Sequence, residues 1–331
     1  MTSGAVVVVP VAFIVALAAI AFIRGSALAR MLVDRPNERS LHRDPTPRIG
    51  GLGLLAGALV AMAVAGETVE LWIAAIAIVL AAISALDDAE SLPVATRLGV
   101  HFGAAALAVA IIGPLGGHSS SGSLAVALLA LLAITWMANL FNFMDGADGL
   151  AGSMAAIGFA ALALAAHRAG APNLVAACAA IAAASAGFLV VNFPPAKVFM
   201  GDAGSVPLGF FAGALGWQGA LQGAWPAWFP VLVFSPFAVD ATLTLIRRLV
   251  AGEPVWKAHR SHYYQRLVLG GWSHRRLLLA QWALMGAAAA SAIVAREQSE
   301  LLQRGILAAW VLAYGVMVFA IDWRYPRKAM P

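Results

Sequence analysis

Long apolar stretches dominate this chain and leave few folds open to it. Of its 331 residues, 62% are hydrophobic and 11% are charged, whereas an average soluble chain has about 25% charged residues. The mean hydropathy is +0.85. The apolar runs are long and rich in Ala, Leu and Val, and they lack the alternation over about 10 residues that marks a barrel strand. They predict membrane-spanning helices and exclude a soluble globular domain.

A helix needs about 20 residues to cross roughly 30 Å of hydrocarbon. Eleven apolar segments approach or reach this length, so we predict an all-α polytopic membrane protein with ten or eleven spans. Residues 1–331 form a single transmembrane domain, and we expect the first segment to be retained as a span. Cys178 falls within a span, where we expect a small buried hydrophobe. The predicted spans cover about 4–23, 49–66, 70–86, 98–114, 123–140, 150–167, 173–191, 205–220, 226–246, 275–295 and 304–321.

Basic residues are distributed unevenly between the two sides that this span count creates. Eighteen of the 21 Lys and Arg residues fall on one side, and only Arg168, Arg296 and Arg304 fall on the other. The positive-inside rule therefore predicts a periplasmic N-terminus and a cytoplasmic C-terminus. The formal charge of +5 follows membrane sidedness, so it indicates no nucleic-acid partner. The predicted cytoplasmic loops lie near residues 24–48, 87–97, 141–149, 192–204 and 247–274.

Most carboxylates gather on the same side as the basic residues. A transporter would place polar groups near the middle of the bilayer, whereas this pattern favours an enzyme that acts on a lipid head group. A multi-span transporter or flippase remains an alternative from another class. Asp240 is inside a predicted span and is either functional or an ion-pair partner of an arginine. The predicted cytoplasmic carboxylates are Asp34, Glu38, Asp44, Asp87, Asp88, Glu90, Asp145, Asp148, Asp202, Glu253 and Asp322, and Glu67, Glu70, Glu297 and Glu300 lie outside.

Two adjacent carboxylates, Asp87 and Asp88, end the third predicted span. They cannot both ionise cheaply unless a metal ion or an arginine lies beside them, although a helix end that faces water would need neither. Arg97 follows nine residues later. It either holds a phosphate or extends its charge to the membrane surface.

A second polar segment, Asn139–Gly149, separates the fifth and sixth predicted spans. Its Asn142, Asp145 and Asp148 offer oxygen atoms of the kind that Mg²⁺ prefers. Glycines in the same segment permit tight turns. A plain capped turn would not need this many acceptors, so we predict a metal site here.

Two further segments carry candidate site residues. In Asn192–Ser205, Asp202 lies between glycines, which suits a metal ligand near a phosphate, and Phe199 either stacks on a base or packs in the interior. In the last large loop, His259–Arg266 crowds imidazole and basic groups together. That loop suits either a diphosphate or an anionic lipid surface.

Taken together, the motifs resemble the polyprenyl-phosphate N-acetylhexosamine-1-phosphate transferase family. The resemblance covers roughly residues 34 to 275, with the motifs in the expected order, and the family is itself polytopic with cytoplasmic catalytic loops. The matching elements are Thr46–Gly51 to TPxxGG, Asp87 and Asp88 to the aspartate pair, Asn139–Leu150 to NxxNxxDGxDGL, Phe199–Ser205 to FxGDxGS, and His259 to the first histidine of the last-loop motif.

This resemblance implies a reaction at the cytoplasmic face of the bacterial inner membrane. UDP-N-acetylhexosamine and undecaprenyl phosphate would give undecaprenyl-diphospho-sugar and UMP, with Mg²⁺ or Mn²⁺ as the cofactor. By analogy, the catalytic group is Asp87, Asp88 (a candidate base), Asp145, Asp148 and His259, the metal ligands are Asn142 and Asp202, and the substrate-binding residues are Arg48, Arg97, Asn192, Phe199, Gly201, Arg260 and His262.

One departure from the family pattern bears on the sugar. The family often has His-x-His in its last loop, whereas here the second histidine, His262, comes three residues after the first. This form resembles the branch that initiates the O-antigen of lipopolysaccharide. The loop of about 27 residues from Arg247 to Ser273 gives no sign of an elaboration for a peptide-bearing substrate. We therefore expect a small N-acetylhexosamine, with a phospho-N-acetylmuramoyl-pentapeptide transferase or an inactive homologue as alternatives. A homodimer remains open.

Overall fold

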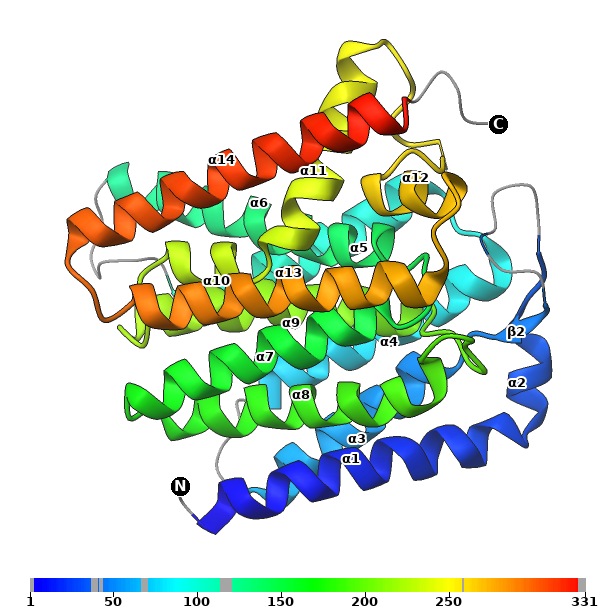
Figure 1. The fold of residues 1–331 in the computed structure, drawn as a ribbon. Coiled ribbons are helices and arrows are strands. Elements are labelled where there is room, and N and C mark those ends of the chain that lie inside the picture. The colour runs from blue at the N-terminus through cyan, green and yellow to red at the C-terminus, as the bar shows by residue number, and fades with distance from the viewer. Residues whose placement is uncertain are drawn as a thin grey trace.

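The computed structural model describes residues 3–36, 41, 44–66, 71–113, 121–257 and 259–326. Glu38, Glu67 and Glu70, which were expected in loops, lie outside these ranges. The described chain is almost entirely helical, which confirms the all-α prediction (Figure 1). Its sheet consists of two antiparallel strands of two residues each, in which Val33 pairs with Pro47. The elements are α1 (Ser3–Arg24), α2 (Ala27–Met31), β1 (Val33–Asp34), β2 (Thr46–Pro47), α3 (Gly50–Val64), α4 (Leu71–Glu90), α5 (Val94–Ile112), α6 (Ser121–Phe143), α7 (Leu150–Arg168), α8 (Pro172–Asn192), α9 (Asp202–Leu221), α10 (Trp228–Val233), α11 (Ser235–Val250), α12 (Tyr263–Leu269), α13 (His274–Ala295) and α14 (Glu300–Arg324).

Within the described ranges, eight helices are long and apolar enough to cross a membrane, so the chain is a multi-pass membrane protein. They are α1, α4, α5, α6, α7, α8, α13 and α14. Shorter or more polar helices, α3, α9 and the pair α10 and α11, occupy the other three predicted spans. The total of eleven spans and the orientation of the termini stay predictions.

The predicted span over 226–246 is not one continuous helix. It is divided into α10 and α11, which meet at Phe234 and Ser235. Pro236 lies in the first turn of α11, where its missing N–H needs no partner, but its ring would clash with a continuing helix. The break cannot be predicted from the pattern of apolar residues, because the segments on both sides of it are apolar.

Close packing in the bundle depends on small residues. A Cβ atom on Gly57 of α3 would lie 2.5 Å from the carbonyl oxygen of Ala12 in α1. Such small-residue contacts let helix backbones approach closely within a bilayer. Cys178 in α8 is fully buried, as expected. In contrast, α14 crosses the outside of the bundle and is the least buried of the described candidate spans (Figure 1).

An aromatic cluster lies behind the end of α6. The ring of Phe141 lies 5.8 Å from that of Phe234 and 5.2 Å from that of Phe237, both in edge-on contact. Phe159 of α7 adds a further edge-on contact with Phe234 at 5.7 Å. All four rings are fully or almost fully buried. This cluster fixes α6 and α7 against the break between α10 and α11, and so positions the polar segment that follows Phe141.

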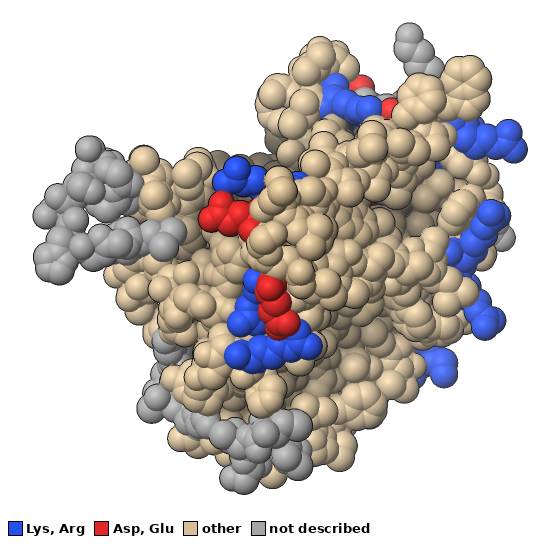
Figure 2. All heavy atoms as spheres, turned by 60° about the vertical axis from the view of Figure 1, so that its left-hand side comes forward, with Lys and Arg blue, Asp and Glu red and all other residues tan. Residues whose placement is uncertain are grey.

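Charges are sparse on the face that Figure 2 presents, which includes the left-hand end of the bundle in Figure 1. This end carries the paired charges of two connections. Arg168 contacts Glu297 at 2.8 Å, and Arg304 contacts Glu300 at 3.0 Å. The sequence assigns these four residues to the outer side of the membrane, and this sidedness stays a prediction. The motif residues gather at the opposite end.

Candidate active site

Two segments that are far apart in the sequence join through their backbones at the right-hand end of Figure 1. The N–H of Phe199 donates to the carbonyl of Pro47 at 2.9 Å, and the N–H of Gly50 donates to the carbonyl of Phe199 at 2.8 Å. A Cβ atom on Gly51 would lie 2.3 Å from the Cα of Gly204. Because only glycine permits so close an approach, the glycines of both motifs are explained by this junction. The junction brings Arg48 and Asp202 to one place.

Asp88 links this junction to the end of α4. Its Oδ2 accepts a hydrogen bond from the backbone N–H of Asp202 at 3.0 Å. Its Oδ1 lies 3.2 Å from Nη1 of Arg48, whose Nη2 contacts Asp34 at 2.8 Å. The Asp88 side chain is 3% exposed. A carboxylate at the first turn of α9 is also favoured by the positive end of the helix dipole.

The neighbouring Asp87 points to a different cation. Its Oδ2 lies 3.0 Å from Nη1 of Arg97, and its Oδ1 accepts a hydrogen bond from the N–H of Leu92 at 2.7 Å. Each carboxylate of the aspartate pair therefore has one arginine beside it, which is one of the arrangements that the sequence left open. Arg97 uses its guanidinium on Asp87 and so does not simply extend to the membrane surface.

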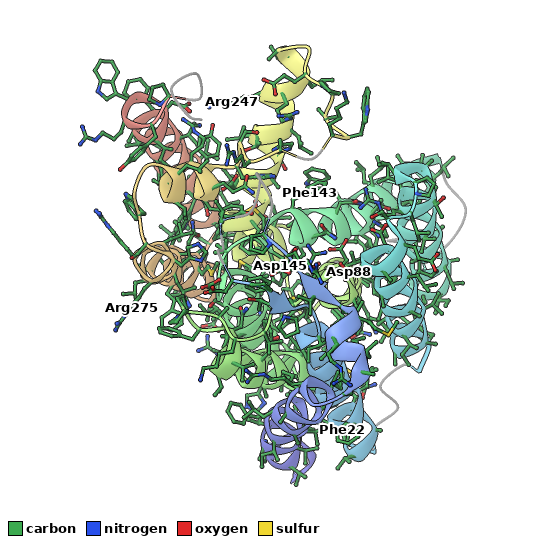
Figure 3. All side chains as sticks on the ribbon, turned by 90° about the vertical axis from the view of Figure 1, so that its right-hand side faces the viewer. Phe22, Asp88, Phe143, Asp145, Arg247 and Arg275 are labelled. Atoms are coloured by element: carbon green, nitrogen blue, oxygen red, sulfur yellow. The ribbon has the colours of Figure 1, made fainter. Side chains whose placement is uncertain are left out.

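Asp145 and Asp202 complete a cluster of four carboxylates. The side chain of Asp202 is hydrogen-bonded to Asn142, and the backbone N–H of Gly201 donates to Asp145. Burial raises the pKa of Asp145 well above its usual value, and the nearby charges of Asp202 and Asp88 raise it further. Figure 3 shows Asp88 and Asp145 near the centre of this end of the bundle, with Arg275 at its margin.

If all four carboxylates ionised, they would outnumber the guanidinium groups of Arg48 and Arg97 beside them, and burial together with this mutual repulsion raises the pKa of Asp145. The described residues contain no ready-made group of three or more His, Cys, Asp or Glu with metal-site geometry. The donors available are carboxylate oxygens and the amide of Asn142, which are of the class that a hard divalent cation prefers. The donor chemistry and this excess of carboxylates over guanidinium groups both fit Mg²⁺.

Asp148 and Asn192 hold the loops of the site together. Oδ2 of Asp148 accepts a hydrogen bond from the N–H of Ala196 at 3.1 Å, and its Oδ1 lies 3.2 Å from Nδ1 of His274. The amide of Asn192 accepts from the N–H of Gly149 at 2.8 Å and donates to a carbonyl of its own loop. Neither residue lines the main cavity. Their predicted catalytic and substrate-binding roles stay predictions.

A cavity of about 690 Å³ opens beside the carboxylates. One part of its wall is polar, and another part is apolar and comes from α4, α5 and α6, including Ile83, Leu98 and Leu132. The predicted site residues in its lining are Asp87, Arg97, Asn142, Asp202, His259 and His262. The other polar or aromatic lining residues, to which no site role was predicted, are Ser84, His101, Thr135, Trp136, Asn139, Phe143, Trp256, Lys257 and Gln265.

Six other predicted site residues lie outside this lining. Arg48, Asp88 and Asp145 do not line the cavity, but they contact one another or the segment around Asp202, as described above. The backbone of Phe199 joins the two motif segments, and Gly201 adopts a positive φ of 74° directly before α9. Arg260 follows the lining residue His259. The stacking, substrate-binding and diphosphate roles expected of these residues stay predictions.

Asp240 organises the last loop, and its partners differ from those expected. Its Oδ1 accepts a hydrogen bond from the N–H of Tyr263 at 2.9 Å and lies 3.2 Å from Nδ1 of His262. Its Oδ2 accepts from the N–H of Tyr264 at 2.9 Å. The His262 ring stacks between Phe143 and Tyr264, with centroids at 6.2 and 5.8 Å. The sequence placed Asp240 in a span but gave no sign of this histidine partner, because the two are 22 residues apart.

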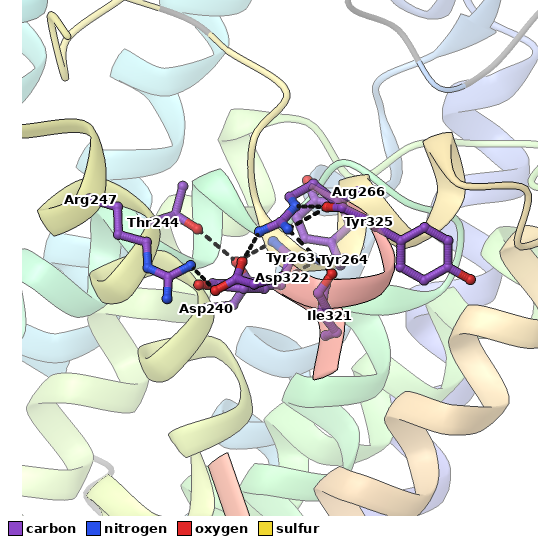
Figure 4. A network of polar contacts seen from close by, with 9 residues as sticks. All are labelled: Asp240, Thr244, Arg247, Tyr263, Tyr264, Arg266, Ile321, Asp322 and Tyr325. Atoms are coloured by element: carbon purple, nitrogen blue, oxygen red, sulfur yellow. Dashed lines mark hydrogen bonds and ion pairs between the residues drawn. The ribbon is translucent and has the colours of Figure 1, made fainter. Parts of the chain in front are cut away.

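The end of α14 fixes α12 from its other side (Figure 4). Arg266, which is 2% exposed, contacts Asp322 at 2.7 Å and donates to the carbonyl of Tyr325. Arg247 also pairs with Asp322. Both guanidinium groups lie over the ring of Tyr263, at 5.0 and 5.3 Å from its centroid. Burial raises the pKa of Tyr263 to about 12, so its hydroxyl stays protonated.

The segments that form this site are similar in sequence to known proteins. The glycosyl transferase family 4 model matches residues 71–219, which include the aspartate pair and Asp202. The decaprenyl-phosphate N-acetylglucosaminephosphotransferase of Mycolicibacterium smegmatis is 30% identical over 310 residues, which cover 80% of this chain and 75% of the relative. The undecaprenyl-phosphate alpha-N-acetylglucosaminyl 1-phosphate transferase of Yersinia pestis is 27% identical over 345 residues, with 95% and 91% coverage.

A shorter match involves another branch. The phospho-N-acetylmuramoyl-pentapeptide-transferase of Geobacillus thermodenitrificans is 34% identical over 164 residues, or 48% of each chain. The two matches described above that extend over most of the chain are to N-acetylglucosamine-phosphate transferases. This chain belongs to glycosyl transferase family 4, among the polyprenyl-phosphate N-acetylhexosamine-1-phosphate transferases.

Proposed function

We propose that the protein transfers N-acetylhexosamine-1-phosphate from a UDP-sugar to undecaprenyl phosphate. The products are undecaprenyl-diphospho-sugar and UMP, and the site faces the cytoplasm at the bacterial inner membrane. The observation that carries this proposal is the cavity itself. Asp87, Asn142 and Asp202 line the same space as an apolar wall made by helices that are long enough to span a membrane. A reaction between a lipid and a water-soluble nucleotide needs such a boundary.

The apolar wall suits the isoprenoid chain of the acceptor. Leu98 and Leu132 come from α5 and α6, and both helices are candidate membrane spans. Arg97 lies in the first turn of α5, close to where this wall meets the carboxylates. An isoprenoid chain along the wall would therefore bring its phosphate to Arg97.

The donor would enter from the polar side of the cavity. Lys257 and His259 belong to the last loop and line this side, with Arg260 next in sequence. Their cationic and imidazole groups suit the diphosphate of a UDP-sugar. The ordered loop depends on Asp240, which holds His262 and the start of α12.

Asp202 and Asn142 would hold Mg²⁺, with Asp145 beside them. The ion would supply neutralisation of the charge that develops on the transferring phosphoryl group. The protein's own contribution is to fix the donors. Asp88 holds the N–H of Asp202, and Arg48 holds Asp88.

Direct attack is the simplest chemistry for this arrangement. An oxygen of the lipid phosphate forms a bond to the β-phosphorus of the donor, and the bond from that phosphorus to the bridging oxygen breaks to release UMP. The second pKa of a phosphate monoester is about 6, so the nucleophile is largely dianionic at neutral pH and needs no strong base. Asp88, which already accepts from Arg48 and the N–H of Asp202, then acts by positioning. A two-step route through an aspartyl intermediate is the alternative, and trapping a phospho-sugar on the enzyme would support it.

We favour a small N-acetylated hexosamine as the sugar, and the O-antigen or another surface polysaccharide as the pathway. The support is the His262 spacing together with two relatives that act on N-acetylglucosamine and match most of the chain. The pentapeptide substrate is the second candidate, because its transferase matches about half of the chain.

The test is UMP release by purified protein in detergent, with undecaprenyl phosphate, Mg²⁺ and a panel of UDP-N-acetylhexosamines that includes UDP-N-acetylmuramoyl-pentapeptide. Asp202→Asn should abolish UMP release. The control Glu300→Gln also removes one negative charge, but at the opposite end of the bundle, so it should leave UMP release unchanged. Release that needs the lipid supports the proposal and identifies the donor. Lipid-independent release, or full activity in Asp202→Asn, would refute it.

A further inference from the structure

His101 is a buried imidazole in the wall of the main cavity that the reaction described above does not use. It lies on α5 one helical turn after Arg97, is 8% exposed, and lines the cavity with Asp87 and Asn139. A lone histidine in an apolar helix is often a structural residue. Its hydrogen bonds show instead which of its nitrogen atoms is available to a ligand.

The orientation of Asn139 fixes the protonation of the ring. Nδ2 of Asn139 donates to the carbonyl of Thr135 at 2.8 Å, so Oδ1 is the atom that faces His101. Nδ1 of His101 lies 3.3 Å from this oxygen. An amide oxygen only accepts hydrogen bonds, so Nδ1 carries the proton. Nε2 of the neutral ring then has a free lone pair.

Nε2 has no hydrogen-bond partner among the described residues. It is also not one of the fully buried polar atoms that lack a partner in the described chain, so a ligand in the cavity can reach it. Since the ring lines the cavity, this nitrogen is available to whatever occupies it. The charged groups near the ring are Arg97 on its own helix and Asp87 on α4. These two already pair with each other.

The depth of His101 indicates which ligand it meets. It lies seven residues into α5, about 10 Å along the helix axis from Val94. Leu98 and Leu132 line the same part of the helix pair. A water-soluble nucleotide bound by Lys257 and His259 would approach from the polar side, whereas a lipid phosphate would lie at the apolar boundary near Arg97 and His101.

We propose that His101 binds the phosphate head group of the lipid acceptor through Nε2. The inference rests on the proposed function and adds to it the side chain that recognises the acceptor. The phosphate binds with one proton, which it takes from water if it arrives as the dianion, and its P–OH donates a hydrogen bond to Nε2. Passing this proton to Nε2 leaves the phosphate dianionic for attack beside an imidazolium, with Arg97 near the charged oxygens. The total charge of this pair is the same whichever atom holds the proton. This arrangement limits the repulsion between the phosphate and the neighbouring carboxylates, of which Asp87 is one.

Two substitutions separate binding from packing. His101→Asn places an amide nitrogen where Nδ1 was, so it keeps the bond to Asn139 and removes only the outer nitrogen. His101→Gln restores a polar group near the position of Nε2. We expect His101→Asn to raise the KM for undecaprenyl phosphate about tenfold while the KM for the UDP-sugar stays unchanged, because one hydrogen bond to a charged group is lost. His101→Gln should stay within about threefold of wild type.

A binding measurement keeps this test independent of turnover. Trp136 lines the same cavity, so its fluorescence can report the binding of undecaprenyl phosphate to the full-length protein. Weaker binding in His101→Asn than in His101→Gln supports the proposal even if no sugar donor is found. Equal lipid affinity in wild type and His101→Asn would overturn it. A shift in the KM for the UDP-sugar alone, or equal losses of affinity and thermal stability in both variants, would overturn it as well.

Discussion

The carboxylate of Asp240 lies 3.2 Å from Nδ1 of His262 and accepts the two backbone N–H groups that follow this histidine. One buried acid therefore sets both the start of α12 and the tautomer of an imidazole that lines the cavity. With Nδ1 protonated toward the carboxylate, Nε2 is the atom that remains for a substrate. The relationship makes α11 a support for the last loop.

Replacing Asp240 should therefore impair catalysis through His262. We expect Asp240→Asn to lower kcat/KM for the UDP-sugar by at least about tenfold, because loss of the charged acceptor weakens the bonds that fix the ring and α12. Steady-state UMP release measures this effect. Glu253→Gln, a change at an exposed acid of the same loop region, should behave like wild type. Unchanged kinetics in Asp240→Asn would contradict the positioning role.

The metal prediction concerns Asp202 and Asn142. We expect Asp202→Asn to lower kcat by more than about 100-fold and to weaken the activation by Mg²⁺, because a charged donor is lost from the proposed site. Asn142→Asp should retain more activity than Asn142→Leu, since it keeps an oxygen ligand. Titration of activity with Mg²⁺ after removal of metal by EDTA checks both effects. Activity that survives complete metal removal would refute the account of this site.

Asp145 should make the metal-free protein less stable at high pH. Its pKa is raised in the folded protein, so the folded state resists losing this proton, whereas the unfolded carboxyl ionises near pH 4. The free energy of unfolding therefore falls as the pH rises from this value toward the raised pKa. Asp145→Asn has no such proton, and it should unfold at a higher temperature than wild type, with a larger difference at pH 8 than at pH 5.

Thermal unfolding in detergent with EDTA tests this prediction. Adding Mg²⁺ should reduce the advantage of Asp145→Asn, because the ion neutralises the carboxylates of the wild type. If the difference in unfolding temperature between Asp145→Asn and wild type does not change with pH, ionisation of Asp145 is not what lowers the stability at high pH.

The contact between α14 and α12 should control the order of the last loop. Asp322 forms ion pairs with both Arg247 and Arg266. We expect Asp322→Asn to increase amide hydrogen exchange in residues 259–269 and to leave exchange in α7 and α8 unchanged. Glu297→Gln, at the other end of the bundle, is the matched control. Equal exchange in wild type and Asp322→Asn would show that α14 does not hold the loop.

Much of the fold could be predicted from the sequence, because apolar length directly determines membrane-spanning helices. The break between α10 and α11 could not, since an apolar segment reads the same whether or not Pro236 divides it. Within the site, the motifs located Asp87, Asp88, Asn142 and Asp202. Spacing alone could not show that Asp148 bonds to His274, that Asp240 bonds to His262, or that His101 enters the cavity wall. These are tertiary contacts between distant helices.

The most direct test of the central claim is mass spectrometry of the lipid product. Purified protein would be incubated with undecaprenyl phosphate, Mg²⁺ and a UDP-N-acetylhexosamine, beside Asp202→Asn. The account predicts an undecaprenyl-diphospho-N-acetylhexosamine that appears with one equivalent of UMP in wild type and is lost in the variant. A product that carries the sugar through a single phosphate, with UDP released, would contradict transfer of the sugar-1-phosphate.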